Sequence, residues 1–529
     1  MIPPPPLDRR EFLKRSVRAC AVASGVAVTA LSLAGCESVA SPSTTTSTTS
    51  LGPPTVVDWR RLSDSLAGTL VLPSSASYAT DRLLYNSKFA TLHPSAIAYC
   101  SNADDVSRCV DFVARHAIEL SARSGGHSYG GYSSCSGLVI DVSRLNVVNV
   151  EAKANLAKVG AGARMIDVYN AIGNMDRLLP GGSCPTVGIS GLALGGGIGV
   201  FGRKFGLTSD NLRSAKLVTA AGDRLSVDSS SHADLLWACR GGGGGNFGVV
   251  TSFEFDIHPM PEVTLFSLQY PWDAAATMLE AWQHWINLMP DELWSNCQLF
   301  SQGTYGYLAQ INGVFCGSPT ALGSLLAQLR SIIGTTPSST FVGSDDYIEA
   351  MKIEAGCSKL SIAACHLPTD NHYGELSREA YSAKSSYLDA PTTSAHAALL
   401  VHAVETLKEY APTVGGGLAF DAYGGAINRV GKSQTAFVHR DKLACIQATY
   451  SWSSYTSQSE IASGQRWLTW LGSEVFSPHT GAYQNYIDPT LLDWKTAYYG
   501  TNLERLVKVK KTYDPENLFT FAQSIPVRL

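Results

Sequence analysis

Two glycine-rich stretches hold the residues whose chemistry is most informative, a cysteine in one and a histidine in the other. The longer stretch, residues 179–212, reads LPGGSCPTVGISGLALGGGIGVFGRKFGLTSDNL and contains Cys184. Glycine lets backbone N–H groups approach a ligand closely, which is how many loops bind phosphate. A formal G-x-G-x-x-G occurs at Gly197, Gly199 and Gly202, but the Val/Ile-rich strand that should precede a dinucleotide fingerprint is missing. We therefore predict a nucleotide-binding loop without a Rossmann unit.

The shorter stretch, residues 120–141, reads LSARSGGHSYGGYSSCSGLVID and contains His127. A short strand enters this loop, and an alternating apolar run, residues 138–140, leaves it. Taken alone, His127 would be a loop histidine satisfied by backbone, and Cys184 would be an ordinary buried thiol. The presence of both loops in one chain points to a more specific role.

The motifs S-G-G-H-S at Ser124–Ser128 and G-S-C-P-T-V-G at Gly182–Gly188 resemble the flavin cradle of the vanillyl-alcohol oxidase superfamily. Within it they are similar to the berberine-bridge-enzyme-like and oligosaccharide-oxidase branch. The resemblance implies an FAD attached twice, by His127 to the flavin 8α carbon and by Cys184 to C6, with the redox step carried out by the flavin. It implies these cofactor-binding residues besides the two attachment points: Ser124, Gly125, Gly126, Ser128, Tyr129, Gly182, Ser183, Thr186, Val187, Gly188, Gly191, Gly195, Gly196, Gly197, Val249, Asn485 and Asn502.

Oxidation of an alcohol by flavin needs a base for the hydroxyl proton. Residues 483–486, YQNY, resemble the branch's Y-x-N-Y motif, and residues 419–425, AFDAYGG, resemble the strand at the floor of its substrate pocket. The resemblance implies Tyr486 as the base, Asp421 as its assistant and Tyr483 in the pocket lining. A tyrosine pKa of about 10 would have to be lowered by positive charge or by hydrogen bonds to the phenolate. The alternative is a pair of buried tyrosines with satisfied hydroxyls.

Val187 lies three residues after Cys184. In this branch a valine leaves the oxygen approach to the flavin open, so the resemblance favours an oxidase that releases hydrogen peroxide over a dehydrogenase. The function expected is oxidation of the anomeric hydroxyl of a mono- or oligosaccharide to a lactone. The alternatives are a secondary metabolite as substrate, another electron acceptor, and a lipoprotein that binds a ligand without turnover. The tryptophans of the substrate half would stack on either class of substrate: Trp282, Trp285, Trp294, Trp452, Trp467 and Trp470.

Short strands and helices must position these residues. Helices are predicted at 104–117, 165–172, 232–239 and 274–289, and strands at 147–150, 157–159, 215–219, 249–257 and 308–315. The glycine run 241–248 lacks the Gly-Lys-Ser/Thr of a P-loop, which excludes nucleoside triphosphate binding, and is expected near the FAD. The fold class expected is α+β, with a two-part PCMH-type FAD-binding domain, a substrate domain built on an antiparallel sheet flanked by helices, and a C-terminal segment that returns to the flavin. The expected boundaries are 1–36 for a signal, 37–56 for a linker, 57–259 for the FAD-binding domain, 260–480 for the substrate domain and 481–529 for the C-terminal segment.

The N-terminus has the features of an export signal. Residues 8–14, DRREFLK, match the twin-arginine pattern, and residues 19–34 are apolar but too short and too mild for a stable membrane span. Residues 33–36, LAGC, resemble a lipobox, which predicts lipidation of Cys36; a plain signal sequence is the alternative. Residues 41–50 are almost entirely Ser and Thr and suit a flexible tether. We expect a periplasmic or cell-surface protein anchored through Cys36, with the membrane contacted only through that anchor.

Composition excludes several classes of partner. The chain has 529 residues, 45% of them apolar, and a net charge of −4, which gives no basic footprint for nucleic acid. Of the 12 cysteines, an odd number remains once Cys20, Cys36 and Cys184 are set aside, so at least one is unpaired. The spacing of Cys100 and Cys109 permits a disulfide without requiring one, and no spacing suggests a metal site. We expect a monomer that takes a small-molecule substrate and O2.

Overall fold

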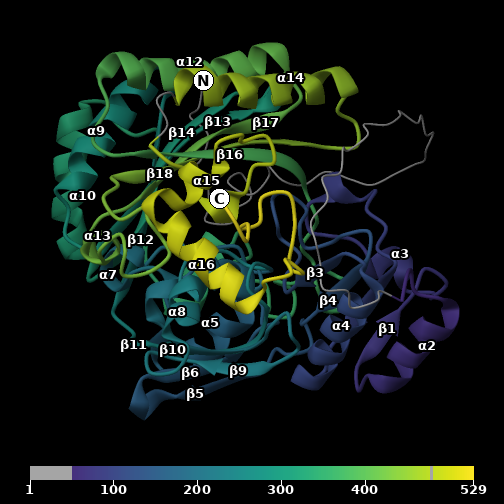
Figure 1. Cartoon of the computed structure of the whole chain (residues 1–529). Helices are drawn as coiled ribbons and strands as arrows, with labels where there is room; N and C mark the ends of the chain where they lie inside the picture. The colour runs from purple at the N-terminus through teal and green to yellow at the C-terminus, as the bar shows by residue number, and fades with distance from the viewer. Residues whose placement is uncertain (1–50, 477–479) are drawn as a thin grey trace.

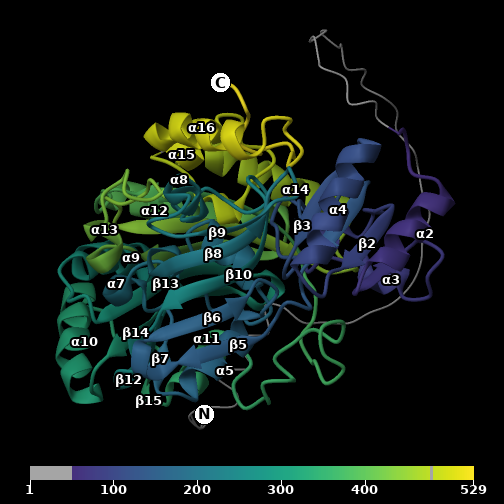
Figure 2. The same cartoon turned by 60° about the horizontal axis from the view of Figure 1, so that its bottom comes forward.

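The computed structural model describes residues 51–476 and 480–529. The signal, Cys36 and all of the linker before residue 51 lie outside the described residues. In the described part, an α+β fold is built on three large sheets and a two-stranded ribbon. Figure 1 and Figure 2 show the N-terminal sheet, in purple and blue, at one side of the molecule and the C-terminal helices, in yellow, against the middle of the chain.

The first sheet has the order β1-β2-β4-β3 and carries the His127 loop at the end of β3. Strands β2 and β3 run parallel to β4, and α4 makes the crossover between β2 and β3. Asn102 caps α4 by accepting a hydrogen bond from the Asp105 N–H, and Ala117 ends it in a left-handed conformation with φ 51°. The elements of this part are α2 (Val56–Ser65), β1 (Thr69–Val71), α3 (Tyr78–Asp81), β2 (Ala96–Tyr99), α4 (Ala103–His116), β3 (Leu120–Arg123) and β4 (Leu138–Asp141).

The second sheet has the order β5-β6-β10-β8-β9 and is antiparallel throughout. The glycine-rich stretch with Cys184 runs between β7 and β8 and forms the short helices α6 and α7 and a 3-10 turn at Thr208–Asn211. No Rossmann strand precedes these glycines in the described chain, as predicted. The elements are β5 (Val148–Glu151), β6 (Leu156–Gly160), α5 (Met165–Gly173), β7 (Arg177–Leu178), α6 (Ile189–Leu194), α7 (Gly202–Phe205), β8 (Leu212–Val218), β9 (Arg224–Val227), α8 (Ala233–Cys239), β10 (Val249–Asp256) and β11 (His258–Pro259).

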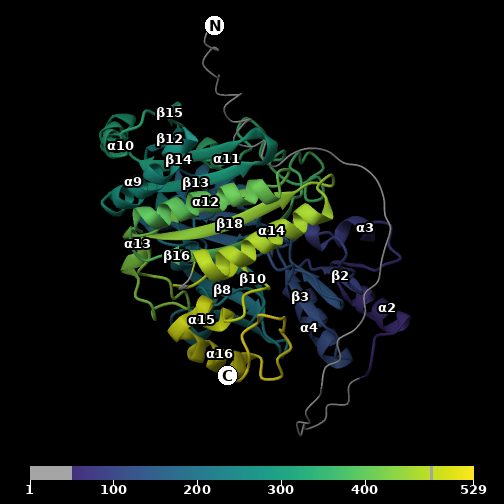
Figure 3. The same ribbon diagram turned by 90° about the horizontal axis from the view of Figure 1, so that it is seen from above.

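A seven-stranded antiparallel sheet has the order β15-β12-β14-β13-β17-β18-β16. It lies in the part of the chain predicted to bind the substrate, which we call the substrate half. Figure 3 shows α12 and α14 lying across this sheet, where they pack on β13, β17 and β18. The elements are β12 (Val263–Tyr270), α9 (Ala275–Asn287), β13 (Leu293–Gln302), β14 (Tyr307–Cys316), α10 (Pro319–Ile333), β15 (Ser339–Ser344), α11 (Tyr347–Glu354), β16 (Ala380–Leu388), α12 (Ser394–Tyr410), β17 (Gly415–Ala422), α13 (Gly425–Arg429), β18 (Ala444–Trp452) and α14 (Gln458–Trp470).

The tryptophans of this half do not serve the role expected of them. Trp282 and Trp285 are at most 1% exposed, inside the core formed by α9 and the sheet, and Trp294 and Trp467 are buried as well. The remaining two, Trp452 and Trp470, pack against the same core. Large aromatic side chains bury most area by packing inward, so these residues stabilise the core.

The last segment, α15 (Trp494–Tyr499) and α16 (Leu503–Tyr513), folds back on the first half of the chain, where α16 contacts α8. Leu506 and Val507 are buried, and Pro515 lies beyond the helix end. Lys510 of α16 is fully buried, and its ammonium donates to Asp514 and to the Asn246 carbonyl. This contact ties the C-terminus to the glycine run 241–248.

Two cysteine pairs differ in chemistry. Cys357 and Cys365 form a disulfide, which the sequence analysis did not identify. Cys100 and Cys109 are both free, and their thiols share a hydrogen bond. Across residues 51–476 and 480–529, no helix has both the length and the apolar character needed to cross a bilayer.

Candidate active site

A cavity of about 470 Å³ forms where the two glycine-rich loops, the glycine run 241–248, the seven-stranded sheet and the C-terminal segment meet. The predicted site residues that line it are Ser124, Gly125, Gly126, His127, Ser128, Tyr129, Gly182, Ser183, Cys184, Val187, Gly188, Gly191, Val249, Tyr483, Asn485 and Tyr486. Residues from both ends of the chain thus come together in one cavity. Thr186, Gly195, Gly196, Gly197, Asp421 and Asn502 lie outside its lining.

The two loops pack glycine against glycine. A Cβ at Gly125 would overlap the backbone of Gly188, and a Cβ at Gly188 would overlap Ser124. Only glycine permits so close an approach of two backbones. The S-G-G-H-S and G-x-C-P-T-V-G motifs therefore place His127 and Cys184 in one cavity by direct contact between the loops.

His127 is half-buried, and its imidazole is neutral. Burial, with a further contribution from the positive charge of Arg164, lowers its pKa to about 3. Its Nε2 lies 2.9 Å from Thr186 Oγ1, and its ring stacks on Tyr85 with a centroid distance of 3.9 Å. The imidazole is thus held in one orientation, and Nδ1 is left as the nitrogen for a further bond.

The Cys184 side chain is also neutral. A neutral thiol carries its proton, whereas a neutral imidazole has lost one. Burial raises the pKa of the Cys184 thiol to about 11, and the negative charge of Glu379 adds to the shift. Hydrogen bonds from Thr186 and from the Val187 backbone oppose the shift without cancelling it. The thiolate, which is the reactive form, is therefore a minor species at neutral pH.

Three tyrosines form an aromatic group in the cavity. Tyr129 stacks on Tyr486 with centroids 5.1 Å apart, and Tyr483 meets Tyr486 edge-on at 4.9 Å. Gln447 donates a 2.8 Å hydrogen bond to the Tyr129 hydroxyl. The Tyr483 hydroxyl accepts from the Gly197 N–H and from Asn485 Nδ2, both at 2.9 Å, so it is satisfied by the protein itself.

The expected lowering of the Tyr486 pKa is not found in the protein alone. Burial raises this pKa well above its usual value, and the charge of Asp421 raises it further. Tyr129, Cys445 and Tyr483 raise this pKa as well, so the strongest influences on it in the described chain all favour the protonated tyrosine. Tyr486 therefore keeps its proton unless a neighbouring group accepts it.

Asp421 is suited to accept that proton. It lies on β17 beside Asn296 of β13, whose amide donates to it at 2.5 Å, and burial raises its pKa to about 6. Glu354, at the end of α11, has its pKa raised to about 7, first by burial and then by the charge of Asp421. Asp421 thus lies near Tyr486, and Glu354 lies near Asp421.

Strand register explains why Asp421 and Gln447 serve the same site. Asp421 pairs with Cys445, and Ala419 pairs with Gln447, so all four side chains lie on one face of the sheet. Gln447 and Glu354 were not identified from the sequence. The alternation of Cys445 and Gln447 along β18 was an available signal for Gln447, but no local pattern marks Glu354 or Tyr85.

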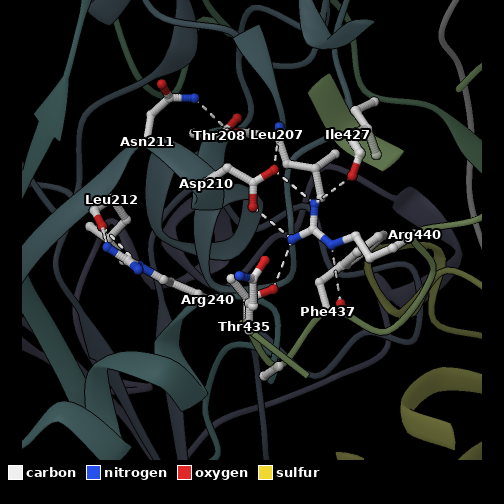
Figure 4. Close-up of polar contacts among 12 residues, drawn as sticks. Leu207, Thr208, Asp210, Asn211, Leu212, Arg240, Ile427, Thr435, Phe437 and Arg440 are labelled. Carbon is white, nitrogen blue, oxygen red and sulfur yellow. Dashed lines mark hydrogen bonds and ion pairs between the residues drawn. The ribbon is translucent and has the colours of Figure 1, made fainter. Parts of the chain in front are cut away.

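An ion-pair network fixes the end of the Cys184-bearing stretch to the substrate half (Figure 4). The Arg440 guanidinium donates to both oxygens of Asp210 at 2.8 and 2.6 Å, and also to Thr435 Oγ1 and to the Ile427 carbonyl. Arg440 is 1% exposed and Asp210 10% exposed. The network crosses between residues 207–212 and 427–440 and so limits how far the loops and the sheet can separate.

Gly195, Gly196 and Gly197 shape the site from behind. A Cβ at Gly195 would overlap Asn485, and one at Gly196 would crowd Phe437. Asn502 donates to the carbonyls of Lys432, Thr435 and Ala436, so it holds the same 427–440 segment. In the structure these residues position the groups that line the cavity.

The lining fits FAD. Glycine backbone from two loops and from residues 243–245 supplies N–H groups suited to phosphate, and the tyrosines supply aromatic surface suited to a flavin ring. His127 and Cys184 supply two side chains able to bond the ring.

Comparison with known proteins agrees with this fit. Residues 94–228 match the family model "FAD binding domain", and residues 482–526 match "Berberine and berberine like". The uncharacterized FAD-linked oxidoreductase YgaK of Bacillus subtilis is 33% identical over 87% of this chain and 97% of its own length. The chitooligosaccharide oxidase of Gibberella zeae is 31% identical over 85% of this chain and 91% of its own length. The solved structure of Physcomitrella patens BBE-like 1 covers 89% of this chain and 99% of its own, with 29% identity and a TM-score of 0.81.

Proposed function

The chain belongs to the berberine-bridge-enzyme-like family of FAD-linked oxidoreductases, and from this premise we propose that it is an exported oxidase acting on the anomeric hydroxyl of a mono- or oligosaccharide. The products are a lactone and hydrogen peroxide. FAD, held covalently by His127 and Cys184, supplies the hydride acceptor. Membership in this family sets aside a lipoprotein that only binds a ligand.

One observation carries the proposal: the residues proposed to attach FAD and the proposed base line the same cavity. His127, Cys184 and Tyr486 come from three distant parts of the sequence, yet all three line it. A ligand-binding pocket would not need two nucleophilic side chains beside a tyrosine group. The neutral imidazole of His127, with Nε2 occupied by Thr186, leaves Nδ1 to form the bond to the flavin.

In the reaction, Tyr486 takes the substrate hydroxyl proton while its own proton passes toward Asp421. Asp421 has a pKa of about 6, so it is ionised at neutral pH and can accept a proton. Tyr129 and Gln447 bind and orient the substrate, since they are hydrogen bonded to each other and line the cavity. The aromatic faces of Tyr129 and Tyr486 suit stacking on a sugar ring.

Oxygen as acceptor is supported by Val187, which lines the cavity three residues from Cys184. The similarity to a chitooligosaccharide oxidase supports a sugar as the substrate. Twin-arginine export and a lipid anchor at Cys36 rest on residues 8–14 and 33–36. We further propose that the protein is a monomer and that it lies in the periplasm or at the cell surface. A secondary metabolite as substrate, or an acceptor other than oxygen, would be seen as a different outcome of the test below.

The test is a visible spectrum of the purified protein before and after acid precipitation, followed by a panel of sugars under air. We expect yellow colour that stays in the pellet, bleaching by a sugar, and peroxide. Bleaching without peroxide would replace the oxidase by a dehydrogenase, and bleaching only by phenolic or alkaloid substrates would replace the sugar. Colour that washes into the supernatant would contradict covalent attachment.

Two variants test the proton path. Tyr486→Phe should retain bound flavin and lower kcat by about 10²–10⁴-fold, the usual contribution of general base catalysis; the exposed Tyr455 provides a matched control in Tyr455→Phe. In the unmodified protein, kcat/KM should decrease at pH values below about 6, because Asp421 becomes protonated there. Asp421→Asn should lower the rate and remove this acid limb. An unchanged limb in Asp421→Asn would assign the titration to another group, with Glu354 as the first candidate.

A further inference from the structure

A second cavity of about 260 Å³ lies on the other side of the His127 loop. Arg123, Ser124, Gly125 and Gly126 line both cavities, so the start of the loop forms a shared wall. The second cavity is rich in charged side chains: Arg123, Arg144, Arg164 and Arg378, Asp81, Asp141, Asp167 and Asp370, and His366. Neither the family resemblance nor the proposed reaction uses it.

The carboxylates of this cavity already have donors. Asp370 accepts two hydrogen bonds from Arg164, at 3.0 and 2.9 Å, and Asp167 lies 3.0 Å from His366 Nε2. Asp141 accepts from the Arg123 Nε, and Asp81 is hydrogen bonded to Tyr99. A cation would therefore have to displace existing bonds in order to bind here.

Two guanidinium groups, in contrast, have N–H donors without a hydrogen-bond partner among the described residues. Arg123 is 5% exposed, and its Nη1 has no hydrogen-bond partner within the described chain; the same holds for Nε of Arg378 over residues 51–476 and 480–529. A buried donor without a partner costs about 1–3 kcal/mol, so such donors point to a missing acceptor.

Arg123 lines both cavities, but its charged and polar neighbours belong to the second. The charged and polar groups that it interacts with are Asp81, Tyr99, Asp141 and Arg378, all of which line the second cavity and none the first. Within the described residues, Arg378 donates one hydrogen bond, at 3.3 Å to Thr369 Oγ1. Burial lowers its pKa, and the charge of Arg123 lowers it further. Asp370 raises this pKa by more than Arg123 lowers it, so Arg378 lies near one carboxylate as well as near the Arg123 guanidinium.

We propose that the second cavity binds a small oxyanion, of the phosphate or carboxylate class, between Arg123 and Arg378. An oxyanion would accept the two spare N–H groups and separate the two positive charges. With four arginines against four aspartates, the cavity is neutral until His366 is protonated. Its pKa is raised by Asp167 against the opposing effect of burial, which tilts the cavity toward anions.

The bound anion would stiffen the wall shared with the first cavity. Arg164 donates at 2.7 Å to the Ser124 carbonyl while it holds Asp370, so the His127 loop is already bonded to this arginine cluster. A bound oxyanion would therefore contact the His127 loop from the side of the second cavity. Its binding would not require the substrate, which binds in the first cavity.

The test is isothermal titration calorimetry of the full flavin-loaded protein with inorganic phosphate and, separately, with malonate, each at constant ionic strength set with chloride. We expect saturable binding of at least one of the two, and which one binds distinguishes a phosphate site from a carboxylate site. Arg378→Gln should weaken the affinity at least about tenfold, since hydrogen bonds to charged groups contribute about 1.5–3 kcal/mol. Arg466→Gln, at an exposed surface arginine, is the control and should leave the affinity unchanged.

Arg378→Lys separates charge from geometry, because lysine keeps the charge and loses the fixed fork of donors. It should bind phosphate more weakly than the parent and more tightly than Arg378→Gln. No saturable heat with either anion would overturn the proposal. Equal weakening by Arg378→Gln and Arg466→Gln would overturn it as well, because the effect would then be one of general charge.

Discussion

The His127 loop and the Cys184 loop lie in one cavity, yet the same physical cause prepares them differently. Burial disfavours the charged form of both side chains, lowering the His127 pKa to about 3 and raising the Cys184 pKa to about 11. For an imidazole the neutral form is the nucleophile, whereas for a thiol it is the unreactive form. Burial therefore makes the histidine ready to react at any ordinary pH and makes the cysteine dependent on pH.

The two loops are anchored in similar ways. An arginine–aspartate pair joins each to the substrate half, Arg164 with Asp370 behind the His127 loop and Arg440 with Asp210 at the end of the Cys184 stretch. The second pair is more deeply buried. The comparison predicts that His127 attaches flavin first and that the Cys184 side is more sensitive to loss of its anchor.

The largest effect is expected from removing both attachment points. His127→Ala/Cys184→Ala should release all flavin on acid precipitation, because no covalent bond remains. Each single variant should keep coloured precipitate through its remaining residue. Complete release from either single variant would break the comparison by showing that one residue does not bond the flavin.

The next effect is on the pH dependence of attachment. When apoprotein is mixed with FAD, attachment through Cys184 in His127→Ala should accelerate about tenfold per pH unit from about pH 7 to about pH 9, because the thiolate fraction grows in that proportion below a pKa of about 11. Attachment through His127 in Cys184→Ala should be flat over the same range, since the imidazole is already neutral. The rate of attachment is measured by the colour retained in acid pellets. The same dependence of this rate on pH in both variants would contradict the opposite pKa shifts.

Loss of an anchor should lower stability by an intermediate amount. Arg440→Met leaves Asp210 buried without its partner, which should cost about 3–5 kcal/mol in the free energy of unfolding. Arg164→Met should cost less, about 1–3 kcal/mol, because Arg164 and Asp370 are 10% and 19% exposed. Lys432→Met is the control, since its pair with Asp441 is about half exposed on both sides. Urea unfolding followed by tryptophan fluorescence measures all three, and equal losses would remove the difference between the anchors.

The smallest effect should come from Thr186, which contacts both reactive side chains. Thr186→Val removes the hydroxyl that pairs with His127 Nε2, at a cost of about 0.5–1.5 kcal/mol. Attachment through His127 should slow several-fold because the ring loses its fixed orientation. Thr186→Ser, which keeps the hydroxyl, should restore the rate; failure of this rescue would assign the effect to packing.

Local patterns were sufficient for the helices and strands near the site. The helix predicted at 104–117 is α4, and the one predicted at 165–172 is α5 (Met165–Gly173). Caps, apolar periodicity and glycine act within a few residues, so they can be read from the chain itself. The same reasoning failed for the tryptophans, because a period that marks an amphipathic helix does not say whether its aromatic face meets a core or a substrate.

The sequence by itself determined which residues could do the chemistry: a histidine and a cysteine in glycine loops that can touch, and a tyrosine pair near the C-terminus. Only the tertiary structure decided which groups surround these residues and which protonation states they hold. The register of β17 and β18 brings Asp421 and Gln447 to one face, Glu354 arrives from α11, and Arg123 meets Arg378 behind the loop. Burial and the field of distant charges set the pKa values of these groups, and both depend on contacts between residues far apart in the chain.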